Sequence, residues 1–424
     1  MRRNAVTALS SCAKLWRNCG TRCLMAGSSS DVIGSMQDLR DELAKHTAHM
    51  QKAGSDVTPV ERSSLEPRSS TDSHDKVIVP LGQNQEMRLR YLNPMGYMRF
   101  GRILEDLDTF SVWLSYRHNQ GLANAGKPVH HPMVIVTASV DRIDVKAGKM
   151  RADADIQFEG QISYVGTSSM EATIHVSQEE SQRSWRPVME AKFVLVARDP
   201  IKLRSVPVHP LRPKTEQEIR LFEEGKQNCR SRKEEARTSL LKVQPTLEET
   251  GIQHELFLKT VDEGSHTFRH RVLPTNSVWM EDCRLKNLIV CFPEQRNLYN
   301  KIFGGFLMRK ASELAWANAA VFSNSRPMIL AVDDIMFQKS VEIGSLLYLS
   351  SDVCYTEENC MQVRVHAEVA DVSKRTRYTT NTFHFTFATR DNRKVSEVMP
   401  RTYADGMLYL SGRRHFLEAK KHFT

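Results

Sequence analysis

Hydrophobic positions along the chain follow the same succession of patterns twice. The segments 100–116 and 304–321 carry apolar residues at helical spacing. A short apolar segment precedes each, at 77–80 and 285–292, and four segments with the alternation or β-branched content of strands follow each. These predicted strands are 133–140, 156–164, 170–176 and 188–198 in the first half, and 328–337, 346–355, 361–369 and 379–389 in the second. The pattern predicts an α+β fold, in which one long helix lies across an antiparallel sheet, built twice.

The loop before each predicted helix is repeated as well. Asn93 lies eight residues before Gly101, and Asn297 lies eight residues before Gly305. The glycines are 204 positions apart, whereas the later match of Val140-Asp-Arg-Ile with Val332-Asp-Asp-Ile has an offset of 192. The first copy therefore has 12 more residues between its helix and its next strand, around His118 to His131. A tandem duplication with divergence explains both offsets.

Composition indicates how the first 75 residues are organised. Residues 1–26 contain several arginines, and no acidic residue occurs before Asp31, which is typical of a mitochondrial transit peptide. Residues 27–75 are rich in Ser, Thr, Asp and Lys, so we expect a flexible segment, with a short helix over 36–50.

The remaining boundaries follow from the repeat and from a change in composition between the two copies. Residues 76–200 form the first predicted domain and residues 271–415 the second, with a tail at 416–424. The segment 201–270 opens with several prolines and then becomes rich in charged residues, with a capping-box start at Thr215. We interpret it as a helical linker whose charges face solvent.

Bulk composition excludes several classes of protein. With 40% hydrophobic and 26% charged residues, and no run of about 18 apolar residues, the chain is typical of globular proteins without a transmembrane helix. The net charge of +9 suits an anionic ligand, and the absence of a basic stripe interleaved with aromatics argues against nucleic acid. The eight cysteines lack metal-like spacing, His130-His131 lacks a second ligand pair, and Cys283 and Cys291 fit core thiols better than nucleophiles. The absence of Gly-x-Ser-x-Gly argues against a serine α/β-hydrolase.

Two motifs of the second copy point to a known family. The Asn297 loop closes in Phe303-Gly-Gly before a helix, and Val332-Asp-Asp-Ile-x-Phe-x-x-x-Val-x-x-Gly follows. Together with the duplication and the leader, these motifs resemble the hotdog-fold acyl-coenzyme A thioesterases, above all the mitochondrial tandem-hotdog class (types nine and ten). The resemblance covers residues 76 to 415. It implies two hotdog domains, each a sheet wrapped round a central helix, paired within one chain.

The resemblance also implies a catalytic pair. In the family, an Asn on the loop before one helix acts with an acid on the partner helix, seven residues after the second glycine of the motif. Counted in this sequence, Asp108 and Asn297 form a complete pair. Asn93 faces Ser312, which lacks the acid although Glu313 is adjacent, so we expect one working site and one degenerate site.

Side-chain chemistry fits these roles, although each residue also has a plainer explanation. Partial burial among apolar neighbours would raise the pKa of Asp108 and suit it to act as a general base on water, with direct attack on the thioester as the alternative. Asn297 can orient the water or hold the carbonyl, and the Gly304 and Gly305 N–H groups suit the oxyanion. Acids in early helical turns are also favoured by the helix dipole, and Asn is common in turns.

The resemblance implies hydrolysis of fatty acyl-CoA to free fatty acid and coenzyme A in the mitochondrial matrix, without a metal or redox cofactor. A non-catalytic acyl-CoA sensor and a hotdog hydratase or dehydratase are the alternatives, and neither copy has the His that the latter uses. Basic residues at one hairpin tip, Lys374, Arg375 and Arg377, are candidates for binding the coenzyme A phosphates, or else form a solvated turn. Family members often assemble into trimers of the paired unit, so we expect self-association.

Overall fold

The structure is a computed structural model that describes most of the chain beyond residue 34. The described residues are 35–52, 61–120, 133–145, 150–181, 184–199, 204–262, 264, 267–297 and 301–421. The chain groups into two compact units, Met1–Val32 and Ile33–Thr424, and all described residues belong to the second. The predicted transit peptide and the His130-His131 pair lie outside the described residues.

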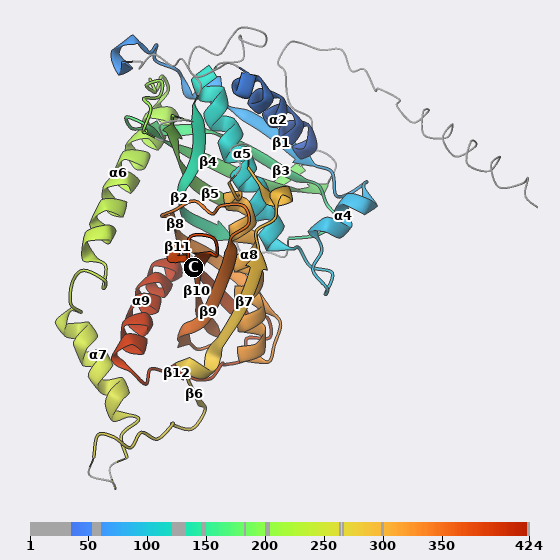
Figure 1. Ribbon diagram of the computed structural model, residues 1–424. Coiled ribbons are helices and arrows are strands. Elements are labelled where there is room, and N and C mark those ends of the chain that lie inside the picture. Colours follow the sequence, from blue (N-terminus) through green and yellow to red (C-terminus); the bar gives the residue numbers. More distant parts are fainter. Residues whose placement is uncertain are drawn as a thin grey trace, which may run out of the picture. The chain divides into compact units, whose positions relative to one another are not determined.

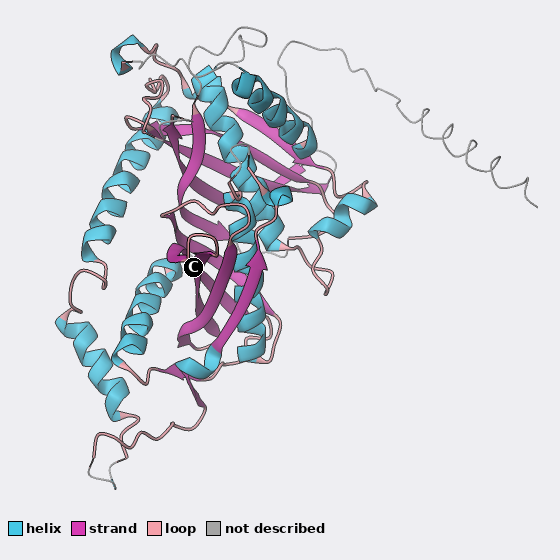
Figure 2. Cartoon of the chain, in the orientation of Figure 1, coloured by secondary structure: helices cyan, strands magenta, loops and turns pink. Residues whose placement is uncertain are grey.

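One antiparallel sheet of ten strands forms the centre of the second unit (Figures 1 and 2). Its strand order is β1-β3-β4-β5-β2-β8-β11-β10-β9-β7. The first-copy strands are β1 (Asp75–Val79), β2 (Val134–Val145), β3 (Ile156–Val165), β4 (Ser169–Ser181) and β5 (Ser184–Arg198). The second-copy strands are β7 (Arg284–Val290), β8 (Pro327–Phe337), β9 (Leu346–Glu357), β10 (Cys360–Asp371) and β11 (Thr376–Thr389). Each strand predicted from the alternation is present, and the order within the second copy mirrors that of the first.

The two copies join where β2 pairs with β8, and the pairing is symmetric. Val140 is opposite Ile335, and Ile143 is opposite Val332. Val332 is the repeat counterpart of Val140, and Ile335 is the repeat counterpart of Ile143. If the two copies were exchanged, each of these two pairs would therefore become the other. This is the register that a two-fold dimer interface would show, here within one chain.

Two long helices, one from each copy, pack against the sheet and against each other. They are α5 (Phe100–Gln120) and α8 (Gly304–Ser323), and both were predicted. The alternation of side chains along β11 distinguishes the two faces of the sheet. Phe383, Phe385 and Phe387 are buried on one face, and His384 faces the C-terminal helix on the other. Figure 1 shows α5 and α8 on one face of the sheet and α6 and α9 on the opposite face. Both sheet faces are therefore covered.

The linker and the C-terminal tail are helical. The linker contains α6 (Glu216–Thr238) and α7 (Leu247–Leu258), and the predicted capping box at Thr215 is confirmed. Helix α9 (Tyr403–Lys420), which the sequence analysis did not predict, crosses the boundary between the predicted second domain (271–415) and the tail, and it starts at a Thr402–Asp405 capping box. On the outer face of the sheet, the His415 ring of α9 stacks on His384 at 3.7 Å between ring centroids, and its Nδ1 lies 3.0 Å from Asp333 Oδ2.

The N-terminal part of the described chain is tied to the first copy. Helix α2 (Met36–Lys52), predicted over 36–50, buries Met36, Leu39 and Leu43. Its Arg40 forms an ion pair with the fully buried Asp106 of α5. Smaller elements complete the fold: η1 (Arg62–Ser64), α3 (Ser70–Ser73), α4 (Gln85–Tyr91), β6 (Ser277–Trp279), η4 (Met280–Cys283), η5 (Pro293–Gln295) and β12 (Glu397–Met399). Residues 61–75, predicted to be part of a flexible segment, thus contain two of these elements.

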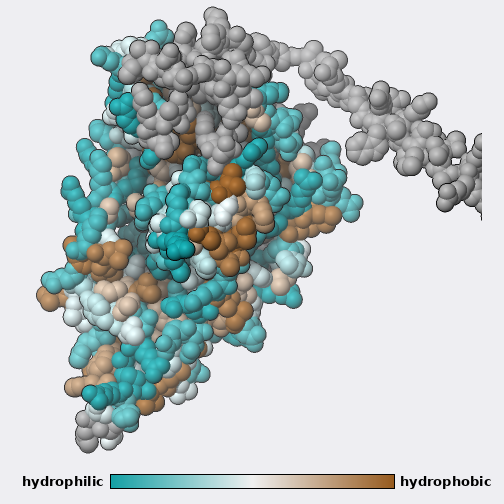
Figure 3. Space-filling view, in the orientation of Figure 1, coloured by the Kyte–Doolittle hydropathy of each residue, from teal (hydrophilic) through white to brown (hydrophobic). Residues whose placement is uncertain are grey.

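Hydrophilic side chains cover much of the face drawn in Figure 3, and hydrophobic ones form separate patches on it. Within the described part of the chain, no helix combines the length and apolar character needed to cross a membrane.

Candidate active site

The N-terminal halves of α5 and α8 cross in close contact, which two glycines permit. A Cβ atom on Gly305 would lie 2.9 Å from the Cα of Glu105, and one on Gly101 would lie 3.1 Å from the carbonyl oxygen of Arg309. The contacts run in opposite directions along the two helices, so the helices are antiparallel here. Glu105 and Arg309 are repeat counterparts, and they form an ion pair of 3.3 Å across the crossing.

Asp108 lies at this crossing and reaches the other copy. Its side chain is buried, with 1% of its surface exposed. Oδ2 accepts a hydrogen bond of 2.6 Å from the backbone N–H of Gly305, at the first turn of α8. The carboxylate of the first copy therefore meets the helix N-terminus that the Asn297 loop leads into, where unpaired N–H groups favour negative charge.

A threonine holds the other oxygen of the same carboxylate. The Thr137 hydroxyl of β2 donates to Asp108 Oδ1 at 2.5 Å. Burial raises the pKa of Asp108 to about 6, and the hydrogen bonds from Thr137 and Gly305 limit the rise because they stabilise the charged form. The result is a carboxylate that is ionised near neutral pH and still basic enough to accept a proton.

Thr137 was not found by the sequence analysis, although the repeat contains a signal for it. With the offset of 192 its counterpart is Ile329, and the two residues hold equivalent positions beside matching bulges, Thr137 opposite Leu195 and Ile329 opposite Phe387. An alignment extended upstream from Val140 would have shown this difference.

The second copy of the centre differs at three matched positions. Ser312 replaces the acid, Ile329 replaces the threonine, and Phe100 occupies the place of Gly304. Gly304 is itself close to the carboxylate, because a Cβ there would lie 3.1 Å from Asp108 Oδ2. The Ser312 hydroxyl donates to the Arg309 carbonyl at 3.0 Å and lies against Gly101. The crossing point at Asp108 thus has the acid, the threonine and the glycine, and the equivalent point at Ser312 has none of the three.

The two asparagines close their loops in the same way. The Asn93 N–H donates to the Tyr97 carbonyl at 2.8 Å, and Asn93 Oδ1 accepts from the Tyr97 N–H at 3.0 Å. The Asn297 N–H donates to Lys301 at 2.6 Å, and its Oδ1 accepts from the Lys301 N–H at 3.1 Å. Each Asn therefore has a structural role in its turn. The loop of Asn297 ends at the Gly305 N–H that Asp108 contacts.

A second acid on α5 has a structural role. Asp106 is completely buried and accepts from the Tyr91 hydroxyl while pairing with Arg40, and Arg102 lies 3.8 Å away. Burial raises its pKa despite these cations. The cluster anchors α2 and α4 to the helix that carries Asp108.

The basic hairpin tip predicted to bind phosphates is partly neutralised by its own hairpin. Lys374 Nζ lies 2.9 Å from Asp371, and Arg377 pairs with Glu368 and lies over the Tyr348 ring. Arg375 has a left-handed backbone with φ 52°. These contacts favour the solvated-turn interpretation.

Other candidate chemistry is not supported by the geometry. Burial raises the pKa of Cys283 to about 12 and that of Cys291 to about 11, so these thiols are poor nucleophiles, as predicted. Among the residues that the structure describes, no group of three or more His, Cys, Asp or Glu side chains is arranged to hold a metal ion.

Comparison with known proteins supports the predicted resemblance. No family model matches the chain. Acyl-coenzyme A thioesterase 9, mitochondrial, from Bos taurus is 46% identical over 386 residues, which span 91% of this chain and 86% of the relative. Acyl-coenzyme A thioesterase 10, mitochondrial, from Mus musculus is 46% identical over 358 residues, which span 84% and 80%. An acyl-CoA hydrolase from Staphylococcus aureus, solved with butyryl coenzyme A and coenzyme A, is 21% identical, with a TM-score of 0.33 over 34% of this chain and 91% of that one.

The two curated relatives confirm three of the predictions made from the sequence. They are of the type nine and type ten class that the motifs resemble, they are named thioesterases, and both are named mitochondrial. An identity of 46% over nine-tenths of the chain leaves no room for an unrelated origin. The chain therefore belongs to the acyl-coenzyme A thioesterase family.

Proposed function

We propose that this chain hydrolyses fatty acyl-CoA to free fatty acid and coenzyme A at a single centre between its two copies. The centre consists of Asp108, Asn297 and the N-terminus of α8. In this proposal residues 76–200 and 271–415 are two hotdog domains joined by the linker 201–270, and they form a double hotdog within one chain.

One observation carries the proposal: the buried Asp108 carboxylate is held by one donor from each copy. Thr137 and the Gly305 N–H fix both oxygens, and burial lifts the pKa of Asp108 to about 6. The structural acid Asp106, on the same helix, is also buried, but it is paired with Arg40, whereas both oxygens of Asp108 are held by neutral donors. A positioned carboxylate with a pKa close to neutral is what general-base catalysis requires.

The reaction balances with water alone. Asp108 accepts a proton from a water molecule as the water oxygen bonds to the thioester carbonyl carbon. The C–S bond of the tetrahedral intermediate then breaks, the proton passes to the departing thiolate, and the products are the carboxylic acid and the free thiol of coenzyme A. A general base of this kind contributes about 10²–10⁴-fold to the rate.

The oxyanion needs donors other than the one that holds the base. Because the Gly305 N–H is engaged by Asp108, we assign the oxyanion to the neighbouring Gly304 N–H and the Asn297 amide group. Loss of one such donor costs about 3 kcal/mol of transition-state stabilisation. The predicted oxyanion role of Gly305 is thereby reduced to positioning Asp108.

Direct attack by Asp108 on the carbonyl would instead form a mixed anhydride. A single turnover with excess enzyme in H₂¹⁸O detects an anhydride that is hydrolysed at the aspartyl carbon. Attack by water places ¹⁸O in the released fatty acid, whereas anhydride formation followed by hydrolysis at the aspartyl carbon places it in the Asp108 side chain.

Release of free thiol from acyl-CoA by purified Asp108→Asn, Asn297→Ala and Ser312→Ala proteins tests the proposal. We expect kcat to fall at least about 100-fold in Asp108→Asn and substantially in Asn297→Ala, with Ser312→Ala close to wild type. Equal losses in all three would contradict a single centre, and full activity of Asp108→Asn would exclude Asp108 as the base.

Two further parts of the proposal concern setting and assembly. We place the activity in the mitochondrial matrix, where the predicted leader would deliver it. We also propose self-association, into a trimer of the paired unit or a similar assembly as the family resemblance implies; the outer strands of the ten-stranded sheet, β1 and β7, are edges that could pair with another copy. Light scattering on the purified protein would measure the assembly, and a monomer at micromolar concentration would exclude it.

A further inference from the structure

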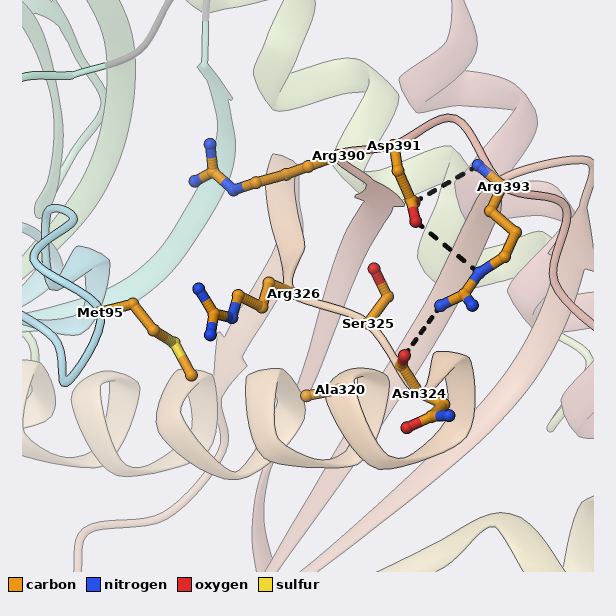
Figure 4. Close-up of a pocket in the computed structure, with 8 residues that line it drawn as sticks. All are labelled: Met95, Ala320, Asn324, Ser325, Arg326, Arg390, Asp391 and Arg393. Atoms are coloured by element: carbon orange, nitrogen blue, oxygen red, sulfur yellow. Dashed lines mark hydrogen bonds and ion pairs between the residues drawn. The ribbon is translucent and has the colours of Figure 1, made fainter.

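The cleft drawn in Figure 4 lies at the end of α8 that is remote from Asp108. It has a volume of about 520 Å³, and one of the residues that line it is Ala320, fifteen residues beyond Gly305 on the same helix. At 1.5 Å per residue the cleft lies roughly 22 Å along α8 from the Asp108 contact. It is therefore separate from the proposed centre, and an acyl group must reach Asp108 past other side chains.

One aromatic ring lies beside Asp108. A Cβ atom on Gly304 would lie 3.1 Å from Asp108 Oδ2 and 3.3 Å from Cε1 of Phe337. The ring and the carboxylate thus border the same side of Gly304, whose N–H we assign to the oxyanion. A thioester carbonyl that accepts from this N–H, and that is attacked by a water molecule on Asp108, would therefore lie against the Phe337 ring.

Asp108 is too enclosed to receive a substrate unless a neighbouring side chain moves. Only 1% of its surface is exposed, and its two oxygens are held by Thr137 and the Gly305 N–H. Phe337 is the last residue of β8 and is only partly buried, and the residues that follow it, 338–340, are exposed. The Phe337 ring can therefore turn toward solvent, whereas the backbone of α8 on the other side of the carboxylate cannot.

Further aromatic rings lie behind Phe337 on the inner face of the sheet. Phe383 meets Phe337 edge-on, with 6.5 Å between the ring centroids and 88° between the ring planes. Phe385 stacks on Phe383 at 6.4 Å, and both of these side chains are fully buried. Apolar walls of this kind suit an acyl group better than the polar pantetheine arm of the substrate.

We propose that Phe337 determines which acyl groups the centre accepts, because its ring forms the wall that limits their length. The inference rests on the proposed function, since it places the acyl group of that substrate. A short acyl group fits beside the ring as it stands, whereas a long one requires the ring to turn and to expose apolar surface to water. The ring therefore disfavours long acyl groups relative to short ones, and a smaller side chain removes this discrimination.

The repeat supplies a matched control. With the offset of 192 the counterpart of Phe337 is Val145. The strand pairing agrees, because Phe337 lies opposite Asn381 and Val145 lies opposite Met189, which are counterparts as well. The ring thus occurs in the copy whose helix start meets Asp108, and Val145→Ala removes apolar volume at the equivalent position of the other copy.

Thiol release from acetyl-, hexanoyl- and lauroyl-CoA tests the proposal. The proteins compared are wild type, Phe337→Ala, Phe337→Leu, Phe337→Trp and Val145→Ala, with thermal melting to confirm folding. We expect the ratio of kcat/KM for lauroyl-CoA to that for acetyl-CoA to rise about 10-fold or more in Phe337→Ala, since one methylene of pocket space can discriminate by this factor. Phe337→Leu should raise the ratio less, Phe337→Trp should lower it, and Val145→Ala should leave it unchanged. If Phe337→Ala does not fold, the opposite changes in the other two Phe337 variants decide the matter.

Binding of S-ethyl- and S-dodecyl-coenzyme A, measured by isothermal titration, makes the test independent of the reaction, because these thioethers cannot be hydrolysed as thioesters are. The affinity for the longer analogue relative to the shorter one should change in the same direction as the kinetic ratio in each variant. A wild type that binds the analogues but releases no thiol would contradict the proposed function, and the binding ratios would still decide this inference.

The reverse outcome is equally distinct. If Asp108→Asn loses activity while wild type and all Phe337 variants share one chain-length profile, the proposed function stands and the inference is wrong. Absence of binding of both analogues to wild type would also overturn it.

Discussion

Asp108 Oδ2 lies 2.6 Å from the backbone nitrogen of Gly305, although the two residues are 197 positions apart in the chain. The hydrogen bond joins the helix of one copy to the helix start of the other. It is the contact through which the two halves of the molecule assemble the proposed centre, and the predictions below follow from it.

The rate of hydrolysis should depend on the ionisation of Asp108. With a pKa of about 6 the carboxylate is charged, and able to accept a proton, above that pH. We therefore expect kcat/KM to be constant near pH 8 and to fall tenfold per pH unit well below pH 6. Thiol release measured from pH 5 to pH 8 would show the inflection, and a flat profile across this range would contradict the assignment.

Replacing Asp108, the proposed base, should make the protein more stable. The pKa of Asp108 rises from 3.8 to about 6 on folding, so between these values the folded chain retains a proton that the unfolded chain has lost. Stability accordingly falls as pH rises through this window, by about 3 kcal/mol in all.

Asp108→Asn should therefore raise the free energy of unfolding at pH 7 by up to about 3 kcal/mol, and by much less near pH 4. Urea unfolding at both pH values measures this difference. A variant that is less stable than wild type at pH 7 would indicate that the carboxylate stabilises the fold.

Removing the Thr137 hydroxyl should lower the fraction of Asp108 that is ionised at neutral pH. Thr137→Val takes away a hydrogen bond that favours the charged carboxylate, so the acid limb of the pH–rate profile should move to higher pH. We expect kcat at pH 7 to fall about 10-fold, the size of a lost hydrogen bond to a charged group.

Two substitutions control this measurement. Thr137→Ser retains the hydroxyl and should restore both the rate and the profile. Ile329→Val changes the equivalent position of the other copy and should leave both unchanged. If Thr137→Ser is as impaired as Thr137→Val, the methyl group rather than the hydroxyl is responsible.

Glycine at position 305 should be required for the helix crossing. In Gly305→Ala the new Cβ would lie 2.9 Å from the Glu105 backbone, which cannot move aside as a flexible side chain can. We expect a loss of about 1–3 kcal/mol in stability, together with loss of activity. Gly251→Ala in α7, where nothing lies within 4 Å, should instead stabilise the chain by up to about 1 kcal/mol. Denaturant unfolding of both variants makes the comparison.

Periodicity and the repeat were sufficient to predict the elements of both copies, because most of these strands and helices bury apolar side chains at regular spacing. They were not sufficient for Thr137, whose role depends on a contact between β2 and α5 across the 12-residue insertion. Helix α9 was missed although Thr402 and Asp405 form a recognisable capping box. The ion pairs of Lys374 with Asp371 and of Arg377 with Glu368 were not anticipated, although the partners are close in sequence.

The symmetric pairing of β2 with β8 has a consequence for how such a molecule diverges. Were the two sides identical chains, any substitution in the helix would appear on both, and losing the acid would abolish activity. In this chain each copy is encoded by its own part of the sequence. Because the two copies are covalently joined, they are present in equal number at any protein concentration. One crossing could therefore exchange its acid, threonine and glycine for Ser312, Ile329 and Phe100, while the other kept the groups of the proposed centre.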